Sequence, residues 1–141
     1  MEKRSVLFLC TGNSARSQMA EAFLRKYGGE GFEAFSAGFR PREINPYTRR
    51  VMEEVGLDLS GHWSKSVMEY MGKRHFSHVI TVCDRVEEDC PTTFPDVTAR
   101  AEWAVEDPAA FAGSDADTLQ KFREVRDQIE AHVKALVAAA R

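Results

Sequence analysis

The alternation of short apolar segments with longer amphipathic segments is the feature of this sequence that most constrains its fold. A strand inside a parallel sheet is buried on both faces and is therefore apolar throughout, whereas a covering helix is apolar at every third or fourth residue. The first such pair is the clearest. Residues 5–9 (SVLFL) predict a buried strand, and residues 17–27, whose apolar positions follow a helical spacing, predict the helix after it.

The same pattern continues to the end of the chain. Three further strands are predicted at residues 32–36, 78–82 and 101–105. Helices are predicted from Asn45-Pro46 to Gly56, over residues 64–72 and over residues 117–140. Strands that are connected through helices form parallel sheets. We therefore predict one α/β domain over residues 1–141, built on a four-stranded parallel sheet flanked by helices on both faces.

Residues capable of chemistry follow several of the predicted strands. Cys10 comes directly after the first strand, Cys83 after the third, and Asp107 shortly after the fourth. Ligands of open parallel sheets bind beyond the carboxyl ends of the strands. The sequence therefore predicts one shared site at that edge of the sheet.

Charge and hydropathy exclude several classes of function. The net charge of -3, from 19 basic and 22 acidic residues, argues against a broad nucleic-acid-binding face. The apolar stretch at residues 6–9 is too short for a signal peptide, and no segment approaches the roughly 20 apolar residues that span a bilayer. We expect a cytoplasmic protein without a membrane partner. In that reducing compartment its three cysteines are not expected to form a structural disulfide framework.

The loop at residues 10–17 (CTGNSARS) has the composition of an oxyanion site. A loop that turns into a helix N-terminus directs backbone N–H groups inward and forms an anion-binding nest, and Gly12 and Asn13 tolerate the left-handed conformations that a nest requires. Arg16 can hold two oxygens of a tetrahedral oxyanion, and Ser17 can donate to a thiolate at Cys10. The predicted oxyanion-binding residues are Thr11, Gly12, Asn13, Ser14, Ala15 and Arg16.

Asp107 is the predicted general acid. When a thiolate attacks an oxyanion, an oxygen must leave, and a proton donor facilitates that step. Asp107-Pro108 lies in the loop after the last predicted strand, where it can face the Cys10 loop.

Two other uses of these residues are disfavoured by their spacing. The Cys10 loop lacks the Gly-Lys-Ser/Thr ending of a nucleotide-binding P-loop. Cys83 and Cys90 are separated by six residues and have no matching His or Cys pair nearby, so a zinc site is not expected.

The motifs resemble those of a known family. The spacing Cys-x5-Arg-Ser is the signature of cysteine-dependent phosphatases, and LFLCTGNSARSQMAE is similar to the low-molecular-weight protein tyrosine phosphatase fold family. Phosphatases of that fold typically carry aromatic residues after the Asp-Pro, where this chain has Ala109-Ala110. The segment TVCDRVEEDCP, at residues 81–91, resembles the redox segment of thioredoxin-coupled arsenate reductases. The match extends through Ser36-Ala37-Gly38, Asn45-Pro46 and Asp107-Pro108.

The resemblance implies a sequence of steps. Cys10 attacks arsenate, Arg16 holds it, and Asp107 protonates the departing hydroxide. Cys83 then attacks Cys10 and releases arsenite, Cys90 attacks Cys83, and thioredoxin reduces the final Cys83–Cys90 disulfide. Phosphate and sulfate would bind as analogues of arsenate. The resemblance implies no bound metal or cofactor and no nucleic-acid or membrane partner, and we expect a monomer.

Two other functions remain open on the sequence. A low-molecular-weight phosphatase that hydrolyses phosphoesters needs only Cys10, Arg16 and Asp107, with Cys83 and Cys90 kept for protection against oxidation. A non-catalytic sensor of oxyanions or of thiol redox state would bind a partner protein, but it has no need of the acid at Asp107.

One position departs from the pattern of some relatives. Those relatives bind potassium behind the anion loop, at positions that correspond here to Asn13, Glu21, Ser36 and a carboxylate. This chain has Lys65 at the carboxylate position. Because an ammonium supplies the positive charge itself, the substitution predicts activity without a potassium requirement.

Overall fold

A computed structural model describes residues 3–83 and 97–140 of the chain. Four strands form one sheet in the order β2-β1-β3-β4, and all three neighbouring pairs are parallel, as predicted. The strands are β1 (Arg4–Cys10), β2 (Phe32–Gly38), β3 (Phe76–Cys83) and β4 (Val97–Ala104). The predicted strands are found, and each is longer than predicted because main-chain pairing continues past the predicted residues.

Three α-helices accompany the sheet: α1 (Arg16–Gly28), α2 (Pro46–Glu53) and α3 (Asp115–Ala139). Asn45 caps α2 as predicted, since its side chain accepts a hydrogen bond from the backbone N–H of Tyr47 at 2.9 Å. The side chain of Ser114 caps α3 in the same way, through the N–H of Asp117. None of the helices in the described ranges is long and apolar enough to cross a membrane.

The helix predicted at residues 64–72 is wrong. Only a 3₁₀ turn, η2 (Val67–Glu69), forms there. The backbone N–H of Gly38 donates to the carbonyl of Lys65 at 2.8 Å, and Gly38 forms a parallel bridge with Ser66. This pairing holds the chain extended up to Ser66, and Gly72, with φ +73°, ends the segment.

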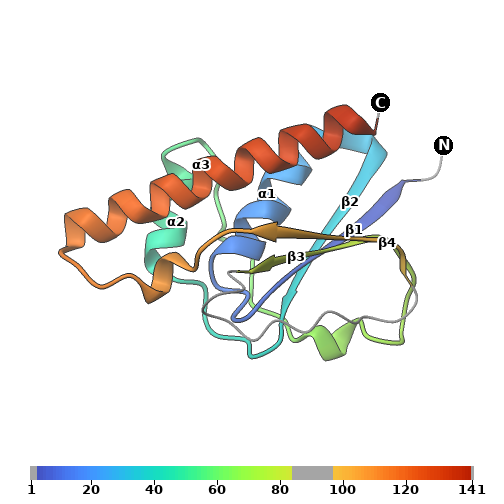
Figure 1. Ribbon diagram of the computed structural model, residues 1–141, viewed down its shortest axis with the longest axis horizontal. Coiled ribbons are helices and arrows are strands. Elements are labelled where there is room, and N and C mark those ends of the chain that lie inside the picture. Colours follow the sequence, from blue (N-terminus) through green and yellow to red (C-terminus); the bar gives the residue numbers. More distant parts are fainter. Residues whose placement is uncertain (1–2, 84–96, 141) are drawn as a thin grey trace.

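The three α-helices pack on one face of the sheet (Figure 1). Val6 and Phe8 of β1 point to that face and contact a core formed by Phe23 of α1, Met52 of α2 and Phe122 of α3. Each such side chain contributes about 1.5–3 kcal/mol when it is fully buried. The helix prediction at residues 117–140 is confirmed, because its apolar stripe forms this contact.

The opposite face of the sheet has a smaller core. Leu7 and Leu9 of β1 point there and pack with Phe76, Val79 and Val67. In the described part of the chain, η2 rather than an α-helix covers this face. The uninterrupted apolar run of β1 follows from burial on both faces.

The segment after β2 runs along the loop between β1 and α1 and binds its carbonyl groups. Backbone N–H groups of Arg40, Arg42 and Asn45 donate to the carbonyls of Thr11, Gly12 and Ser14 at 2.8, 2.9 and 3.0 Å. The side-chain hydroxyl of Thr48 also donates to the Ser14 carbonyl. Because these carbonyls face outward, the loop is free to present its N–H groups on the inner side.

Gly38 makes this contact possible. A Cβ atom at Gly38 would lie 2.8 Å from the backbone N of Asn13 and 2.9 Å from backbone atoms of Gly12 and Thr11. A side chain at this position would therefore push the two segments apart.

We predict that Gly38→Ala lowers the free energy of unfolding by about 2 kcal/mol, the usual cost of forcing an extra carbon into a packed site. Urea denaturation followed by circular dichroism measures this effect. Gly31→Ala is the matched control, since a Cβ there meets no atom within 4 Å, and it should change stability by less than about 0.5 kcal/mol. Equal effects of the two substitutions would show that the close approach at Gly38 is not limiting.

Candidate active site

Cys10 is the last residue of β1, and its side chain is buried in the loop that leads to α1. The backbone N–H of Asn13 donates to its sulfur at 3.2 Å. The hydroxyl oxygen of Ser17, in the first turn of α1, lies 2.8 Å from the same sulfur. Hydrogen bonds to sulfur and a helix N-terminus both favour the thiolate form of a cysteine. The Cys10 sulfur thus has two hydrogen-bond partners beside the start of α1.

Asn13 contacts the same Ser17 hydroxyl that lies against the Cys10 sulfur. It has φ +50°, the left-handed conformation predicted for it. Its Oδ1 accepts from the backbone N–H of Lys65 at 2.8 Å, and its Nδ2 donates to the Ser17 hydroxyl oxygen at 2.7 Å. The Ser17 oxygen accepts a hydrogen bond from the Asn13 amide, so the hydroxyl proton of Ser17 is available to be donated to the sulfur. Gly12, which tolerates the same conformation, does not adopt a positive φ.

Gln18 holds Asn13 in place, and the sequence motifs did not indicate this role. The Gln18 side chain is fully buried, and its Nε2 donates to both the backbone oxygen and Oδ1 of Asn13 and to the carbonyl of Trp63. Its Oε1 lies 2.9 Å from Nδ1 of His62. The residue type of Gln18 gives no sign of this role, because its partners Trp63 and His62 lie far away along the chain.

His62 is part of this scaffold through its contact with Gln18. Burial lowers the pKa of His62 from its ordinary value, although the nearby Glu21 carboxylate opposes this effect. A lower pKa favours the neutral imidazole near neutral pH. Because an amide oxygen only accepts, the neutral ring carries its proton on Nδ1 and donates to Gln18.

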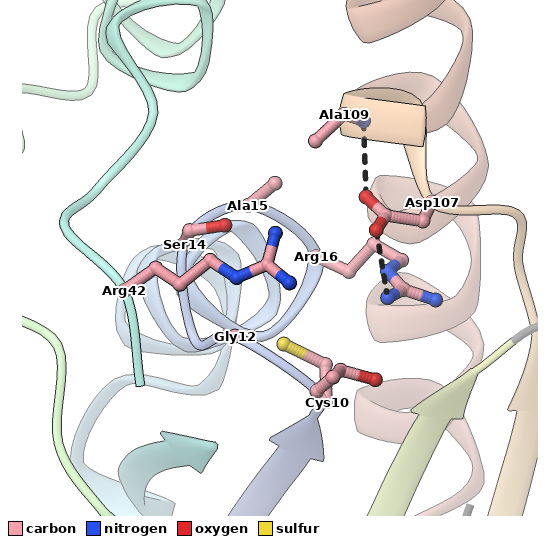
Figure 2. Close-up of a pocket in the computed structure, with 9 residues that line it drawn as sticks. Cys10, Gly12, Ser14, Ala15, Arg16, Arg42, Asp107 and Ala109 are labelled. Carbon is pink, nitrogen blue, oxygen red and sulfur yellow. Dashed lines mark hydrogen bonds and ion pairs between the residues drawn. The ribbon is translucent and has the colours of Figure 1, made fainter. Parts of the chain in front are cut away.

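Arg16 and Asp107 form the other side of the site. Arg16 is almost fully buried, and one guanidinium nitrogen donates to the carbonyl of Val105 at 3.1 Å. A second nitrogen lies 3.7 Å from Oδ2 of Asp107. The other carboxylate oxygen, Oδ1, accepts from the backbone N–H of Ala109, so Asp107 caps the short 3₁₀ turn η3 (Pro108–Ala110). Figure 2 shows Asp107 facing Arg16 across the pocket from Cys10.

These residues line one pocket (Figure 2). Most of the predicted oxyanion-binding residues come together there with Cys10 and Asp107. Asn13, Ser17 and Cys83 do not line the pocket, and the Asn13 side chain donates to the Ser17 hydroxyl oxygen instead. The described residues that line the pocket are Cys10, Thr11, Gly12, Ser14, Ala15, Arg16, Arg42, Asp107 and Ala109.

No aromatic side chain belongs to this lining set, within the ranges that the structure describes. Ala109 occupies the position after Asp107-Pro108 where phosphatases of this fold typically carry a ring. Phe111 is the nearest aromatic residue along the chain, and its ring lies under the Lys121 ammonium at 5.4 Å. The described walls therefore suit a small oxyanion.

Of the two predicted relay cysteines, only Cys83 lies in the described part of the chain. Cys83 is the last residue of β3, the strand that pairs with β1, so it lies at the same edge of the sheet as Cys10. Cys83 is disulfide-bonded in this structure, whereas Cys10 is a free thiol. Cys90 lies outside the described residues, and its predicted role stays a prediction.

Lys65 occupies the region where relatives were expected to bind potassium. Its side chain is buried, and its ammonium donates to the carbonyl of Trp63 at 2.8 Å and lies 3.7 Å from Oε1 of Glu21. The same Glu21 oxygen accepts a hydrogen bond from Ser36. Burial lowers the pKa of Lys65, and the Glu21 carboxylate opposes this effect. Because the Lys65 ammonium already contacts the Glu21 carboxylate, these residues do not fit a potassium ion in addition.

The sheet is parallel, a cysteine and an arginine lie in the loop after its first strand, and an aspartate follows its last strand. Together these features define the class of cysteine-dependent enzymes that act on tetrahedral oxyanions. Residues 5–141 match the sequence model of the family described as low molecular weight phosphotyrosine protein phosphatase. The chain belongs to this family.

Within the family, the chain is similar to proteins named arsenate reductase. The arsenate reductase of Halalkalibacterium halodurans is 38% identical over 135 residues, which cover 95% of each chain. A solved structure described as an arsenate reductase in the phosphate-binding state is 32% identical, with a TM-score of 0.80 over 96% of this chain and 98% of the other. A thioredoxin-dependent arsenate reductase from Corynebacterium glutamicum is 26% identical, with a TM-score of 0.70 over 99% of this chain and 64% of that one.

The Ser17 hydroxyl is expected to activate Cys10. We predict that Ser17→Ala slows the reaction of Cys10 with iodoacetamide at neutral pH about tenfold, because a hydrogen bond to a charged group contributes about 1.5 kcal/mol. Mass spectrometry of the Cys10 peptide follows the reaction. Ser64→Ala is the control, since the Ser64 hydroxyl donates to the Asn13 carbonyl and not to the sulfur. Equal slowing in both variants would assign the effect to loosening of the loop.

The contacts of Lys65 lead to a prediction on ion dependence. Replacing sodium by potassium at constant ionic strength should leave the turnover rate and the thermal unfolding temperature of the protein unchanged, because the Lys65 ammonium already neutralises Glu21. Steady-state kinetics and thermal unfolding in the two salts check this. A clear increase of either quantity in potassium would contradict it.

Proposed function

We propose that this chain reduces arsenate to arsenite with Cys10 as the nucleophile, and that electrons pass through Cys83 and Cys90 from thioredoxin. The observation that carries the proposal is the position of two cysteines on paired strands. Cys10 ends β1 inside an oxyanion pocket, and Cys83 ends the neighbouring β3. The names of the arsenate reductase relatives support the same reaction.

The first step is attack on arsenic. The Cys10 thiolate forms a bond to the arsenic atom of arsenate, and one oxygen leaves as water after it receives a proton from Asp107. Arg16 and the loop N–H groups hold the remaining oxygens. When the oxyanion binds Arg16 it replaces the carboxylate contact at 3.7 Å, which leaves Asp107 free to carry the proton.

The second step reduces the arsenic. The Cys83 thiolate attacks the Cys10 sulfur, and the electron pair of the sulfur–arsenic bond moves to arsenic. Arsenic(V) becomes arsenic(III) and leaves as arsenite, while the two thiols become a Cys10–Cys83 disulfide. The electrons balance, because two thiols lose the two electrons that arsenic gains.

The last steps restore the nucleophile. The Cys90 thiolate attacks Cys83, the Cys10 thiolate departs, and a Cys83–Cys90 disulfide remains. Thioredoxin then reduces this disulfide with its own pair of thiols. The thioredoxin-dependent relative from Corynebacterium glutamicum supports this choice of reductant. We propose a cytoplasmic location. We also propose that the protein acts as a monomer, because all three cysteines belong to one chain.

Phosphoester hydrolysis is the second candidate function. The family description favours it, and Cys10, Arg16 and Asp107 supply what it requires. The absence of an aromatic wall among the described lining residues argues against phosphotyrosine as the main substrate. Slow hydrolysis of an aryl phosphate is expected beside arsenate reduction, because phosphate and arsenate have the same shape and charge.

The relay predicts a specific pattern of activities. With thioredoxin, thioredoxin reductase and NADPH, the wild type should consume NADPH in an arsenate-dependent reaction over many turnovers. Cys83→Ser and Cys90→Ser should each lower this rate to the level seen without the protein, because each removes one thiol of the disulfide exchange. Spectrophotometry of NADPH measures the rate.

Hydrolysis of para-nitrophenyl phosphate is the control for this experiment. Cys83→Ser and Cys90→Ser should keep the wild-type hydrolysis rate, whereas Cys10→Ser should abolish both activities. If arsenate gives no turnover and the wild type hydrolyses the ester as fast as both relay variants, the chain is a phosphatase and the relay is wrong.

A further inference from the structure

We propose that Arg42 is a second oxyanion-binding arginine, which together with Arg16 selects doubly charged tetrahedral anions. The inference rests on the proposed use of the Cys10 pocket for an oxyanion. It adds a residue to the binding site that neither the motif nor the relatives' names assign.

The backbone of Arg42 is attached to the oxyanion loop itself. Its N–H donates to the carbonyl of Gly12 at 2.9 Å, so its Cα is held beside the loop. Its stem lies against the same residue, because a Cβ built on Gly12 would be 3.7 Å from both Cγ and Cδ of Arg42. The start of the side chain is therefore positioned by the loop that forms the anion nest.

The guanidinium of Arg42 reaches the pocket from the side opposite Arg16 and Asp107. Arg42 lines the pocket together with Cys10 and Arg16. Figure 2 shows its guanidinium extending over the loop toward the Cys10 sulfur, while Arg16 and Asp107 stand on the other side. An anion bound at the sulfur would therefore lie between two guanidinium groups.

The two arginines differ in their present partners. Arg16 is engaged with the Val105 carbonyl and Asp107. The Arg42 side chain is exposed, and it makes no hydrogen bond or ion pair with any residue in the ranges that the structure describes. Its charge is thus available to a ligand without breaking an existing contact.

The substrate requires a second cation. Arsenate and phosphate carry close to a double negative charge in weakly alkaline solution, and a thiolate at Cys10 places another negative charge beside them. Arg16 supplies a single positive charge, and its neighbour Asp107 is an acid. A second guanidinium neutralises the excess and offers two more donors to the oxygens that do not leave.

The test is a titration with inorganic phosphate that does not depend on turnover. Isothermal titration calorimetry of the reduced full chain compares wild type, Arg42→Ala, Arg42→Lys and Arg40→Ala. Arg40 is the matched control, because it is also an exposed arginine whose N–H pairs with the loop, but it does not line the pocket. Unchanged thermal unfolding temperatures establish that the variants are folded.

We expect Arg42→Ala to raise the dissociation constant of phosphate about tenfold, the effect of losing one charge-assisted contact. Arg42→Lys should have an intermediate value, and Arg40→Ala should change it about twofold through distant charge alone. The loss in Arg42→Ala should grow as the pH rises from weakly acid to weakly alkaline, because the second phosphate charge is the one that Arg42 neutralises. In turnover, KM for arsenate should rise while kcat is retained.

Equal weakening in Arg42→Ala and Arg40→Ala, or a loss that does not depend on the charge of phosphate, would overturn the inference. Failure of the proposed function is recognised separately. If the wild type binds phosphate but reduces no arsenate, the reductase proposal fails, and the phosphate titration still decides the role of Arg42.

Discussion

The site depends on the hydrogen bonds that join the oxyanion loop to the segment after β2. Arg40, Arg42 and Asn45 donate their backbone N–H groups to loop carbonyls, and the Thr48 hydroxyl adds one more bond. Every carbonyl bound in this way faces away from the pocket. Without these partners, the loop would have to satisfy its carbonyls elsewhere, and N–H groups would no longer be free to converge on one point. The anion nest is therefore built by two segments that are distant in the sequence.

A second layer of polar contacts stabilises the loop from behind. Asn13 is held by Gln18, Lys65 and Ser17, and Gln18 is held in turn by His62. Buried polar groups are costly unless each finds a partner, so such a network favours a single arrangement of the amide groups. That arrangement holds the Ser17 hydroxyl against the Cys10 sulfur. The contacts of Cys10 thus depend on residues that do not line the pocket.

What could be predicted from the sequence was determined by local structure. The strand at residues 5–9 and the Cys10 loop were predicted correctly, because burial on both faces and a turn into a helix leave clear local patterns. The start of β4 at Val97 was missed, since an edge strand with exposed Arg100 and Glu102 lacks the apolar run of a buried strand. The prediction of a helix at residues 64–72 failed because Ser66 pairs with Gly38, which is distant in the sequence, and this pairing competes with the local helical pattern.

In the candidate site, too, residues that belong to local motifs were predictable, whereas residues whose contacts depend on the fold were not. Cys10, Arg16 and Asp107 were recognisable because their chemistry is linked to a short motif or to the end of a strand. The contacts of Gln18 and Arg42 were not predicted, since each involves a partner that only the fold brings near. The Gln18 amide donates to Trp63, 45 residues away, and Arg42 pairs with Gly12. Their residue types alone carry no sign of these contacts.

The topology explains how one pocket can serve two kinds of chemistry. The two proposed reactions, hydrolysis of a phosphoester and reduction of arsenate, begin with the same attack by Cys10 and use Arg16 and Asp107 in the same way. They differ in what attacks next, which is water in the first case and a second thiol in the second. Because β1 pairs with β3, the residue that ends β3 lies at the edge of the sheet where Cys10 lies. In the proposed relay, a cysteine at that position, Cys83, takes the place of water without any change to the pocket around Cys10.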